Sequence, residues 1–229
     1  MLRPFFGYFG GKWRLAHHYP SPQHPTIIEP FAGSAGYSLH YADRQVILVE
    51  KNPVIVGVWR YLISGDPRRV RMLPDTPDAT LLPAERALMG LWFAKAPTAP
   101  RNAPSAWARD PQYRGSSWWG PRIRDRIADQ MPAIRHWVVL QADYSHAPVT
   151  SATWFIDPPY INAGRVYPCG SKDIDYQRLG AWCRQLPGQV LVCEAADANW
   201  LPFSALPGTQ ARLRKTSKHK EALWMKTCC

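Results

Sequence analysis

Cysteine is scarce in this sequence of 229 residues, and its five cysteines include no Cys-x-x-Cys pair. An odd number without paired spacing argues against a disulfide framework and a zinc site, so we expect reduced thiols. None of the seven histidines forms a metal-ligand spacing with a cysteine or an acid. The sequence also lacks an apolar run of about 20 residues, the length of a membrane span, and a secretory signal at its start. We therefore expect a cytoplasmic protein with no metal and no membrane partner.

Acidic residues are few compared with basic ones. Lys and Arg number 28 against 17 Asp and Glu, which gives a net charge of +11, and a surplus of this size favours a polyanionic partner. The excess is local: residues 101–135 hold seven Arg against three Asp, and residues 211–229 hold six Lys or Arg against one Glu. Since 46% of the residues are hydrophobic, the chain can still bury a core.

The clearest secondary-structure pattern lies near the beginning of the chain. Residues 26–28 are β-formers, a turn rich in Gly and Ser follows, residues 37–42 predict a helix, and residues 45–50 predict a second buried strand. A strand, helix and strand in this order predict an α/β fold, a parallel sheet with helices on both faces. Further strands are expected at residues 137–140, 153–156, 189–193 and 222–225, and helices at residues 54–63, 84–94 and 176–186.

Residues 64–134 are interpreted as an insertion between the two halves of one α/β domain, residues 1–63 and 135–229. Seven prolines lie between residues 73 and 111, and a polar, aromatic stretch follows at residues 113–120. This composition is typical of an excursion from a sheet. A helix is expected after Pro121 and is expected to kink or end at Pro132. Its apolar face would consist of Ile123, Ile127, Met131 and Ile134.

A glycine turn at residues 29–36, with the sequence EPFAGSAG, follows the first predicted strand. Gly33 and Gly36 let the backbone approach a ligand closely, and the next helix would present free N–H groups. Glu50 ends the second strand, where an acid can accept hydrogen bonds from both ribose hydroxyls. The spacing differs from GxGxxG and Glu29 would repel a pyrophosphate, so a nucleoside with a cationic end fits better than a dinucleotide. Alternatively, the glycines only form a tight turn.

The sequence Asp-Pro-Pro-Tyr at residues 157–160 follows another predicted strand. Two prolines cannot continue a ladder, so the strand ends there and Asp157 projects into the crevice at the carboxyl edge of the sheet. Asp157 and the Pro158 carbonyl could each accept one N–H of an exocyclic amine, and Tyr160 offers a ring for a planar base. The alternative is a proline-rich turn with a capping Asp.

Four motifs in this order resemble the Dam-like (D12 class) adenine-specific DNA methyltransferases. They are FGGK at residues 9–12, EPFAGSAG at 29–36, VEKN at 49–52 and DPPY at 157–160. The resemblance covers both halves of the α/β domain and weakens across residues 64–134. It implies a Rossmann-like methyltransferase sheet, the cofactor S-adenosyl-L-methionine, and transfer to the N6 amine of a flipped-out adenine. The family often has Asp at the position of Glu50 and Trp at that of Tyr8, and its recognition region is commonly longer.

The resemblance and the two motifs together predict three sets of site residues. The predicted catalytic residues are Asp157, Pro158, Pro159 and Tyr160. The predicted cofactor-binding residues are Tyr8, Gly10, Gly11, Lys12, Glu29, Pro30, Phe31, Gly33, Ser34, Gly36, Glu50, Lys51, Asp143 and Asp157. The predicted DNA-binding residues are Arg101, Arg109, Arg114, Trp118, Trp119, Arg122, Arg124, Arg126, Lys215, Lys218 and Lys220, whose charges and rings suit phosphates and bases.

Double-stranded DNA is the expected partner, and the protein is expected to be a monomer. Residues 64–134 are expected to form a small, mainly helical target-recognition region. This region contains few amides able to read adenine, so the target should be short or relaxed, on the order of one to three base pairs. Three alternatives remain: methylation of RNA adenine, methylation of a protein glutamine amide, and a catalytically inactive DNA-binding relative. Among the basic and aromatic residues, some Trp would be core and some Arg a solvated helix face.

Overall fold

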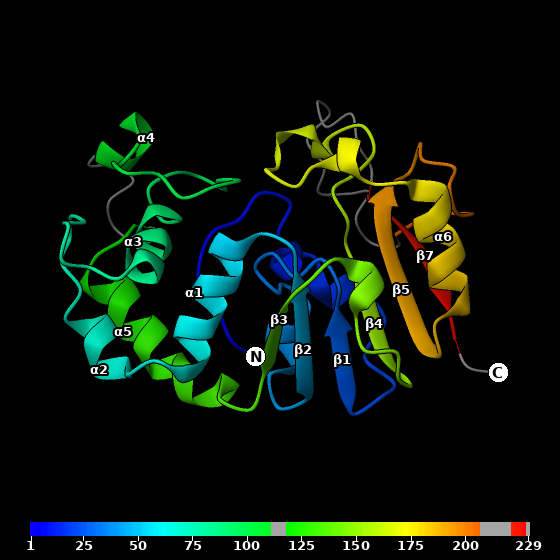
Figure 1. The fold of residues 1–229 in the computed structure, drawn as a ribbon, viewed down its shortest axis with the longest axis horizontal. Helices are drawn as coiled ribbons and strands as arrows, with labels where there is room; N and C mark the ends of the chain where they lie inside the picture. Colours follow the sequence, from blue (N-terminus) through cyan, green and yellow to red (C-terminus); the bar gives the residue numbers. More distant parts are fainter. Residues whose placement is uncertain (111–117, 207–220, 228–229) are drawn as a thin grey trace.

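A mixed β-sheet forms the centre of the structure (Figure 1), a computed structural model that describes residues 1–110, 118–206 and 221–227. Its strands within these ranges are β1 (Thr26–Glu29), β2 (Gln45–Glu50), β3 (Val138–Gln141), β4 (Ala152–Ile156), β5 (Gly188–Ala195), β6 (Ser204–Ala205) and β7 (Glu221–Lys226). They lie in the order β3-β2-β1-β4-β5-β7-β6. Strands β1 to β5 are parallel, and β7 runs antiparallel to β5 and β6. The predicted α/β class is confirmed. The sheet was predicted to be parallel, and it is mostly parallel with an antiparallel β7, which is compatible with a Rossmann-like fold.

Consecutive strand residues face opposite sides of the sheet and enter two hydrophobic clusters. Ile27 of β1 and Phe155 of β4 belong to the cluster that contains α1 residues, whereas Ile28 and Trp154 belong to the cluster that contains α6 residues. All four side chains are fully or almost fully buried. Helices therefore cover both faces, and the continuous apolar runs of β4 and β5 reflect burial on both sides.

Local capping signals explain where the helices begin. The helices are α1 (Pro53–Ser64), α2 (Pro67–Arg71), α3 (Pro83–Gly90), α4 (Ala106–Arg109), α5 (Pro121–Gln130) and α6 (Tyr176–Gln185). The Asn52 side chain accepts a hydrogen bond from the Val54 N–H at 3.0 Å, and Pro53 occupies the first turn of α1. Asp175 caps α6 in the same way through the N–H groups of Gln177 and Arg178. These are the residue types that a helix N-terminus favours.

The helices of residues 64–134 share a core with one face of the sheet. Helix α3 packs on α1, and α2 packs on α5, and Figure 1 shows α2, α3 and α5 beyond the β3 edge of the sheet. The predicted apolar face is confirmed. Ile123 and Ile127 of α5, and Met131 and Ile134 of the 3-10 turn that follows it, are all buried. Helix α5 ends at Gln130, and a 3-10 turn, η5 (Met131–Ile134), contains Pro132.

Some predicted elements differ from the observed ones. The helix expected at residues 37–42 is only a 3-10 turn, η3 (Ser38–Tyr41), and the helix expected at residues 84–94 ends at Gly90. The sequence analysis did not predict α2, α4 or β6, which are all five residues or shorter. Within the described ranges, no helix is long and apolar enough to cross a membrane.

Candidate active site

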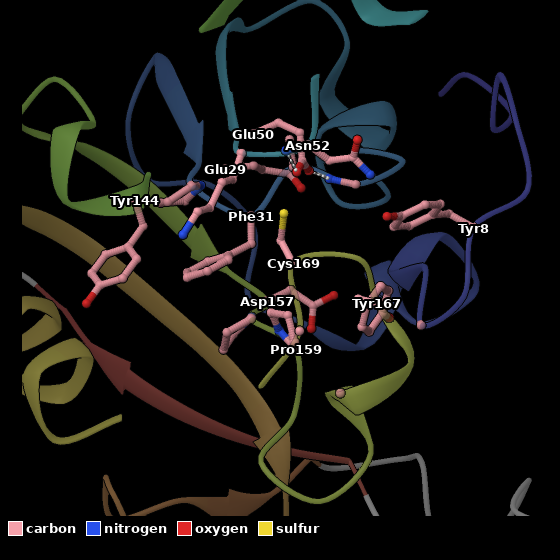
Figure 2. Close-up of a pocket in the computed structure, with 18 of the residues that line it drawn as sticks. Tyr8, Glu29, Phe31, Glu50, Asn52, Tyr144, Asp157, Pro159, Tyr167 and Cys169 are labelled. Atoms are coloured by element: carbon pink, nitrogen blue, oxygen red, sulfur yellow. Dashed lines mark hydrogen bonds between the residues drawn. The ribbon is translucent and has the colours of Figure 1, made fainter. Parts of the chain in front are cut away.

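The strand order places a crevice between β1 and β4. After β1 the chain builds the sheet outward through β2 and β3, and it then returns to place β4 on the other side of β1. In open α/β sheets, ligands bind outside the carboxyl ends of the strands at such a reversal. A cavity of about 1120 Å³, including its open mouth, lies at this point (Figure 2).

Every residue that the sequence predicted for catalysis or cofactor binding lines this cavity. These residues come from the segment before the 3-10 turn η1 (Lys12–Arg14), from the turn after β1, and from the ends of β2, β3 and β4. The fold thus brings separate motifs together at one edge of the sheet. The roles of the individual residues as catalytic or cofactor-binding groups remain predictions.

Glu50 joins the glycine turn to the beginning of α1. Its Oε2 accepts a hydrogen bond from the Gly33 N–H at 3.0 Å, and its Oε1 accepts one from the Asn52 N–H at 2.8 Å. Burial raises the pKa of Glu50, and these backbone donors oppose the rise. Gly33 has a φ of +44°, and a Cβ at this position would lie 3.1 Å from the Tyr8 ring. The turn therefore needs glycine for its backbone conformation and for its contact with Tyr8.

Gly36 brings the N-terminal motif into contact with the same turn. A Cβ at Gly36 would lie 2.5 Å from the backbone nitrogen of Trp13 and 2.8 Å from that of Lys12. No ordinary side chain fits such a gap. The absence of a side chain at Gly36 consequently sets the position of Lys12 in the site.

The prediction that the N–H groups after the glycine turn are free for a ligand is wrong at Ser38, because Glu29 accepts its N–H. Glu29 Oε1 accepts this hydrogen bond, from the first N–H of η3, at 2.8 Å. Glu29 is 2% exposed, and burial raises its pKa to about 8 despite the hydrogen bonds from Ser38. The physical reason is that a buried carboxyl group takes the nearest available donor.

Lys12 and Asp157 form a largely buried ion pair. Lys12 Nζ lies 2.8 Å from Asp157 Oδ1, with the side chains 7% and 18% exposed, and it also donates to the Gly10 carbonyl at 3.0 Å. Burial raises the pKa of Asp157 to about 6, although the Lys12 ammonium opposes this rise. Lys12, predicted as a cofactor-binding residue, therefore lies directly against the predicted catalytic acid.

Glu221 is a neighbour of this pair that the sequence analysis missed. Its Oε1 accepts hydrogen bonds from the hydroxyls of Tyr19, at 2.8 Å, and Tyr160, and it lies 3.8 Å from Lys12 Nζ. Lys12 Nζ also lies 4.6 Å from the centre of the Tyr160 ring, a cation–π contact. Because β7 is antiparallel to β5, its first residue reaches the edge where the parallel strands end. Only knowledge of the direction of β7 could have placed this carboxylate beside Lys12 and Asp157.

The segment that follows the DPPY motif supplies further lining residues. Tyr167 and Cys169 line the cavity, and Figure 2 shows both on the chain that crosses it near Asp157. The Tyr167 hydroxyl donates to the Phe9 carbonyl at 2.8 Å, and the rings of Tyr167 and Tyr8 lie 5.8 Å apart. No motif marked this segment in the sequence. Tyr144, which also lines the cavity, was missed for the same reason, whereas Asn52 belongs to the VEKN motif but was not predicted as a site residue.

Acidic side chains outnumber basic ones in the lining of the cavity. The five acids are Glu29, Glu50, Asp143, Asp157 and Asp173, and the two lysines are Lys12 and Lys51. Glu29 is mostly neutral at neutral pH because its pKa is raised to about 8, but the other four acids still outnumber the lysines. Asp143 lies 3.5 Å from Lys51 Nζ and accepts hydrogen bonds from Ser145. Burial alone would raise the pKa of Asp143. The hydrogen bonds from Ser145 and the Lys51 ammonium outweigh this effect and hold the pKa below its ordinary value. This lining suits a ligand with a cationic group.

The predicted DNA-binding residues are in several different environments. Trp119 is 8% exposed and donates to the Pro74 carbonyl at 2.7 Å, so it offers little surface to a base. Arg124 lies 2.5 Å from Asp75, and Arg126 donates to the Pro4 carbonyl at 3.1 Å. Trp118 is half-buried, and the exposed members are Arg101, Arg109 and Arg122. The members outside the described residues are Arg114, Lys215, Lys218 and Lys220.

The comparisons with known proteins found no match. Neither a protein-family model nor any of the curated proteins compared matches this chain. Within the part of the chain that the structure describes, no group of three His, Cys, Asp or Glu residues could hold a metal ion. Function therefore has to be inferred from the geometry of the cavity and from its motifs.

Proposed function

We propose that this protein is an S-adenosylmethionine-dependent methyltransferase that acts on the N6 amine of adenine in DNA. The observation that carries the proposal is the convergence of the four motifs on one cavity at the reversal of strand order. Asp157 lies at the end of β4, directly across the β1–β4 pair from the glycine turn. This is the position in which open α/β sheets bind ligands.

The lining fits the cofactor in charge and in the kinds of side chain that it offers. Glu50 would hold the ribose, Asp143 the adenine, and the aromatic rings of Tyr8 and Phe31 its apolar surfaces. When bound, S-adenosylmethionine supplies a methyl group on a cationic sulfonium, and the excess of acids around the cavity favours a cation.

Asp157 and Pro158 would hold the amine of the target base. Asp157 Oδ1 is buried against Lys12, so a substrate N–H would use Oδ2, while the Pro158 carbonyl takes the second N–H. Two acceptors favour a pyramidal nitrogen whose lone pair is free to react. With a pKa of about 6, Asp157 is mostly ionised at neutral pH and can also take the proton that the amine loses. Fixed acceptors of this kind are effective because they need no reorganisation during the reaction.

Tyr160 would replace the stacking that a flipped base loses. Its ring contacts Lys12 and its hydroxyl is held by Glu221, so its orientation is set before a base arrives. Base flipping is required because the N6 amine is otherwise stacked inside the duplex. The exposed arginines Arg101, Arg109 and Arg122 could meet the phosphates.

Methyl transfer to defined substrates tests this proposal. Purified protein is incubated with labelled S-adenosylmethionine and either unmethylated duplex DNA, RNA, or a glutamine-containing peptide, and the products are identified by mass spectrometry. We expect N6-methyladenine in DNA alone. Transfer to RNA or to the peptide alone would assign a different substrate, and DNA binding without transfer to any substrate would indicate an inactive relative.

A further inference from the structure

Glu221 is a largely buried carboxylate for which the proposed reaction has no direct use. Its side chain is 12% exposed, and it lies on β7, far in sequence from every motif. Burying a carboxylate is costly unless it is paired and hydrogen-bonded. Glu221 has such partners in Lys12, Tyr19 and Tyr160, all of which surround the predicted catalytic acid.

We propose that Glu221 is a positioning residue of the active site, which acts through Lys12 and Tyr160 on the group that receives the target amine. The inference rests on the proposed function and extends it to a residue outside the four motifs. Glu221 itself is not proposed to contact a substrate. It holds Lys12 and Tyr160, the two side chains that would contact the cofactor or the target base.

Lys12 shows why a second carboxylate matters. An ammonium on a four-carbon stem is flexible and has three N–H donors. Here the Gly10 carbonyl lies 3.0 Å from Nζ, Asp157 Oδ1 lies 2.8 Å away, and Glu221 Oε1 lies 3.8 Å away. The ammonium is thus attracted by carboxylates from two different strands. With Asp157 alone as its anion, Lys12 could follow Asp157 when a substrate draws that side chain away.

Tyr160 is held by the same carboxylate oxygen. Its hydroxyl donates to Glu221 Oε1, which also accepts the Tyr19 hydroxyl. A tyrosine ring fixed at its hydroxyl end can rotate less around its side-chain bonds. Glu221 therefore restrains the stacking ring and the ammonium together.

The charge of Glu221 also affects the proton affinity of Asp157. Burial raises the pKa of Asp157 most strongly, Lys12 lowers it, and Glu221 raises it further. The groups that face Glu221 are Lys12 from the N-terminal segment, Tyr19, Tyr160 and Asp157 from the carboxyl edge, and Cys193 from β5. Neutralising Glu221 leaves Lys12 with a single anion. Asp157 should then lose its proton at a lower pH.

A carboxyl titration by NMR tests the electrostatic part in the protein alone. The Asp157 side-chain carbon is followed from acidic to neutral pH in the wild type, in Glu221→Gln and in Glu85→Gln. Glu85 is a matched control, because it is buried and accepts from Tyr61 and Arg69 but lies on α3. We expect the Asp157 midpoint to fall by roughly half a unit or more only in Glu221→Gln. An unchanged midpoint, or an equal change in Glu85→Gln, overturns the inference.

Transfer rates test the positioning part. We expect Glu221→Ala to lower kcat about tenfold or more with little change in the affinity for S-adenosylmethionine, and Glu221→Gln to recover part of the loss while its acid limb moves to lower pH. Glu221→Asp keeps the charge but shortens the reach, so it should lower kcat even if Glu221→Gln does not fold. A wild-type kcat in Glu221→Ala or Glu221→Asp overturns the inference. If the wild type itself transfers no methyl group, the proposed function fails instead.

Discussion

The cavity and the helices of residues 64–134 use charge in opposite ways. Five acids and two lysines line the cavity, although the whole chain carries +11. On the helices, arginines pair with exposed acids, as Arg124 does with Asp75 and Arg71 with Asp129. Buried charges in the cavity change one another's pKa, whereas exposed pairs are screened by solvent and salt. A substitution should therefore alter chemistry in the first region and mainly stability or partner binding in the second.

Removing the predicted catalytic acid should have the largest effect. We expect Asp157→Ala to lower methyl transfer ~10²-fold or more, as loss of a preorganised group does, and to leave S-adenosylmethionine binding largely intact. Lys12 keeps Glu221 as an anionic neighbour, so the chain should still fold. Asp43→Ala, at an exposed residue just before β2, is the control. Retention of more than about a tenth of the wild-type rate, against that scale of loss, contradicts the assignment.

Glu50→Ala should act on cofactor binding instead of turnover. The loss of two charge-assisted hydrogen bonds to the ribose, worth ~1.5–3 kcal/mol each, should raise the Kd for S-adenosylmethionine about a hundredfold or more. The variant also removes an acceptor for the Gly33 N–H, which would loosen the turn. Isothermal titration calorimetry measures the change, with Asp43→Ala again as the reference. An unchanged Kd would move the ribose site away from Glu50.

Acid should abolish the proposed methyl transfer at a higher pH than an ordinary aspartate would predict. The pKa of Asp157 is raised to about 6, because burial outweighs the opposing effect of Lys12. Below this pH the carboxyl is protonated, so the transfer rate at saturating substrates should fall about tenfold per pH unit. A pH–rate profile measures this effect. A rate that stays constant down to about pH 5, where an ordinary aspartate is still ionised, would contradict it.

Salt dependence separates exposed arginines from structural ones. Replacing Arg101, Arg109 and Arg122 together by Gln should flatten the slope of DNA affinity against salt by up to about one unit per arginine. Replacing Arg124 and Arg126 should leave the slope unchanged and lower the Tm, because these side chains contact Asp75 and Pro4. Binding titrations between low and moderate salt distinguish the two variants. Equal slopes in the first variant and the wild type would show that these three arginines do not contact phosphates.

Glu29→Gln should produce the smallest change, and one visible only against pH. Burial raises the pKa of Glu29 to about 8, so the folded chain binds this proton more tightly than the unfolded chain does. Its contribution to stability is present at low pH and is lost as pH rises from the unfolded value through 8. Glu29→Gln has no ionisable group at this position, so its stability does not fall with rising pH for this reason. Its Tm relative to the wild type should therefore be higher at pH 9 than at pH 5, and an equal difference at both values would contradict the shift.

The sequence predicted most of the sheet because its strands are short apolar runs bounded by turn residues. The predicted strand at residues 45–50 coincides with β2, and the others lie within three residues of the observed bounds. The cavity residues were predictable for a related reason. Motifs at the ends of parallel strands meet at one edge whatever the details of packing. DPPY after β4 is one such motif.

The missed features depend on contacts between distant residues. Nothing local in residues 222–225 shows that β7 is antiparallel, so Glu221 could not be placed. Glu29 was predicted to face a ligand, but its proximity to the Ser38 N–H follows from the tight turn between them. The contacts of the arginines on α5 could not be predicted from the sequence either. The helical spacing of the residues places these arginines outside the apolar face of α5, but only the packed structure shows that Arg126 donates to the Pro4 carbonyl.

The antiparallel course of β7 has a consequence for the order in which the surroundings of Asp157 are assembled during synthesis. Tyr19 and Glu221 are 202 residues apart in the chain and meet at one oxygen. A ribosome releases the N-terminal segment long before the strand that carries Glu221, and pairings between such distant segments form late in folding. Until β7 joins β5, Lys12 has only Asp157 as its anion. A nascent chain can thus complete its parallel strands, which position the motifs around the cavity, before Glu221 reaches Lys12.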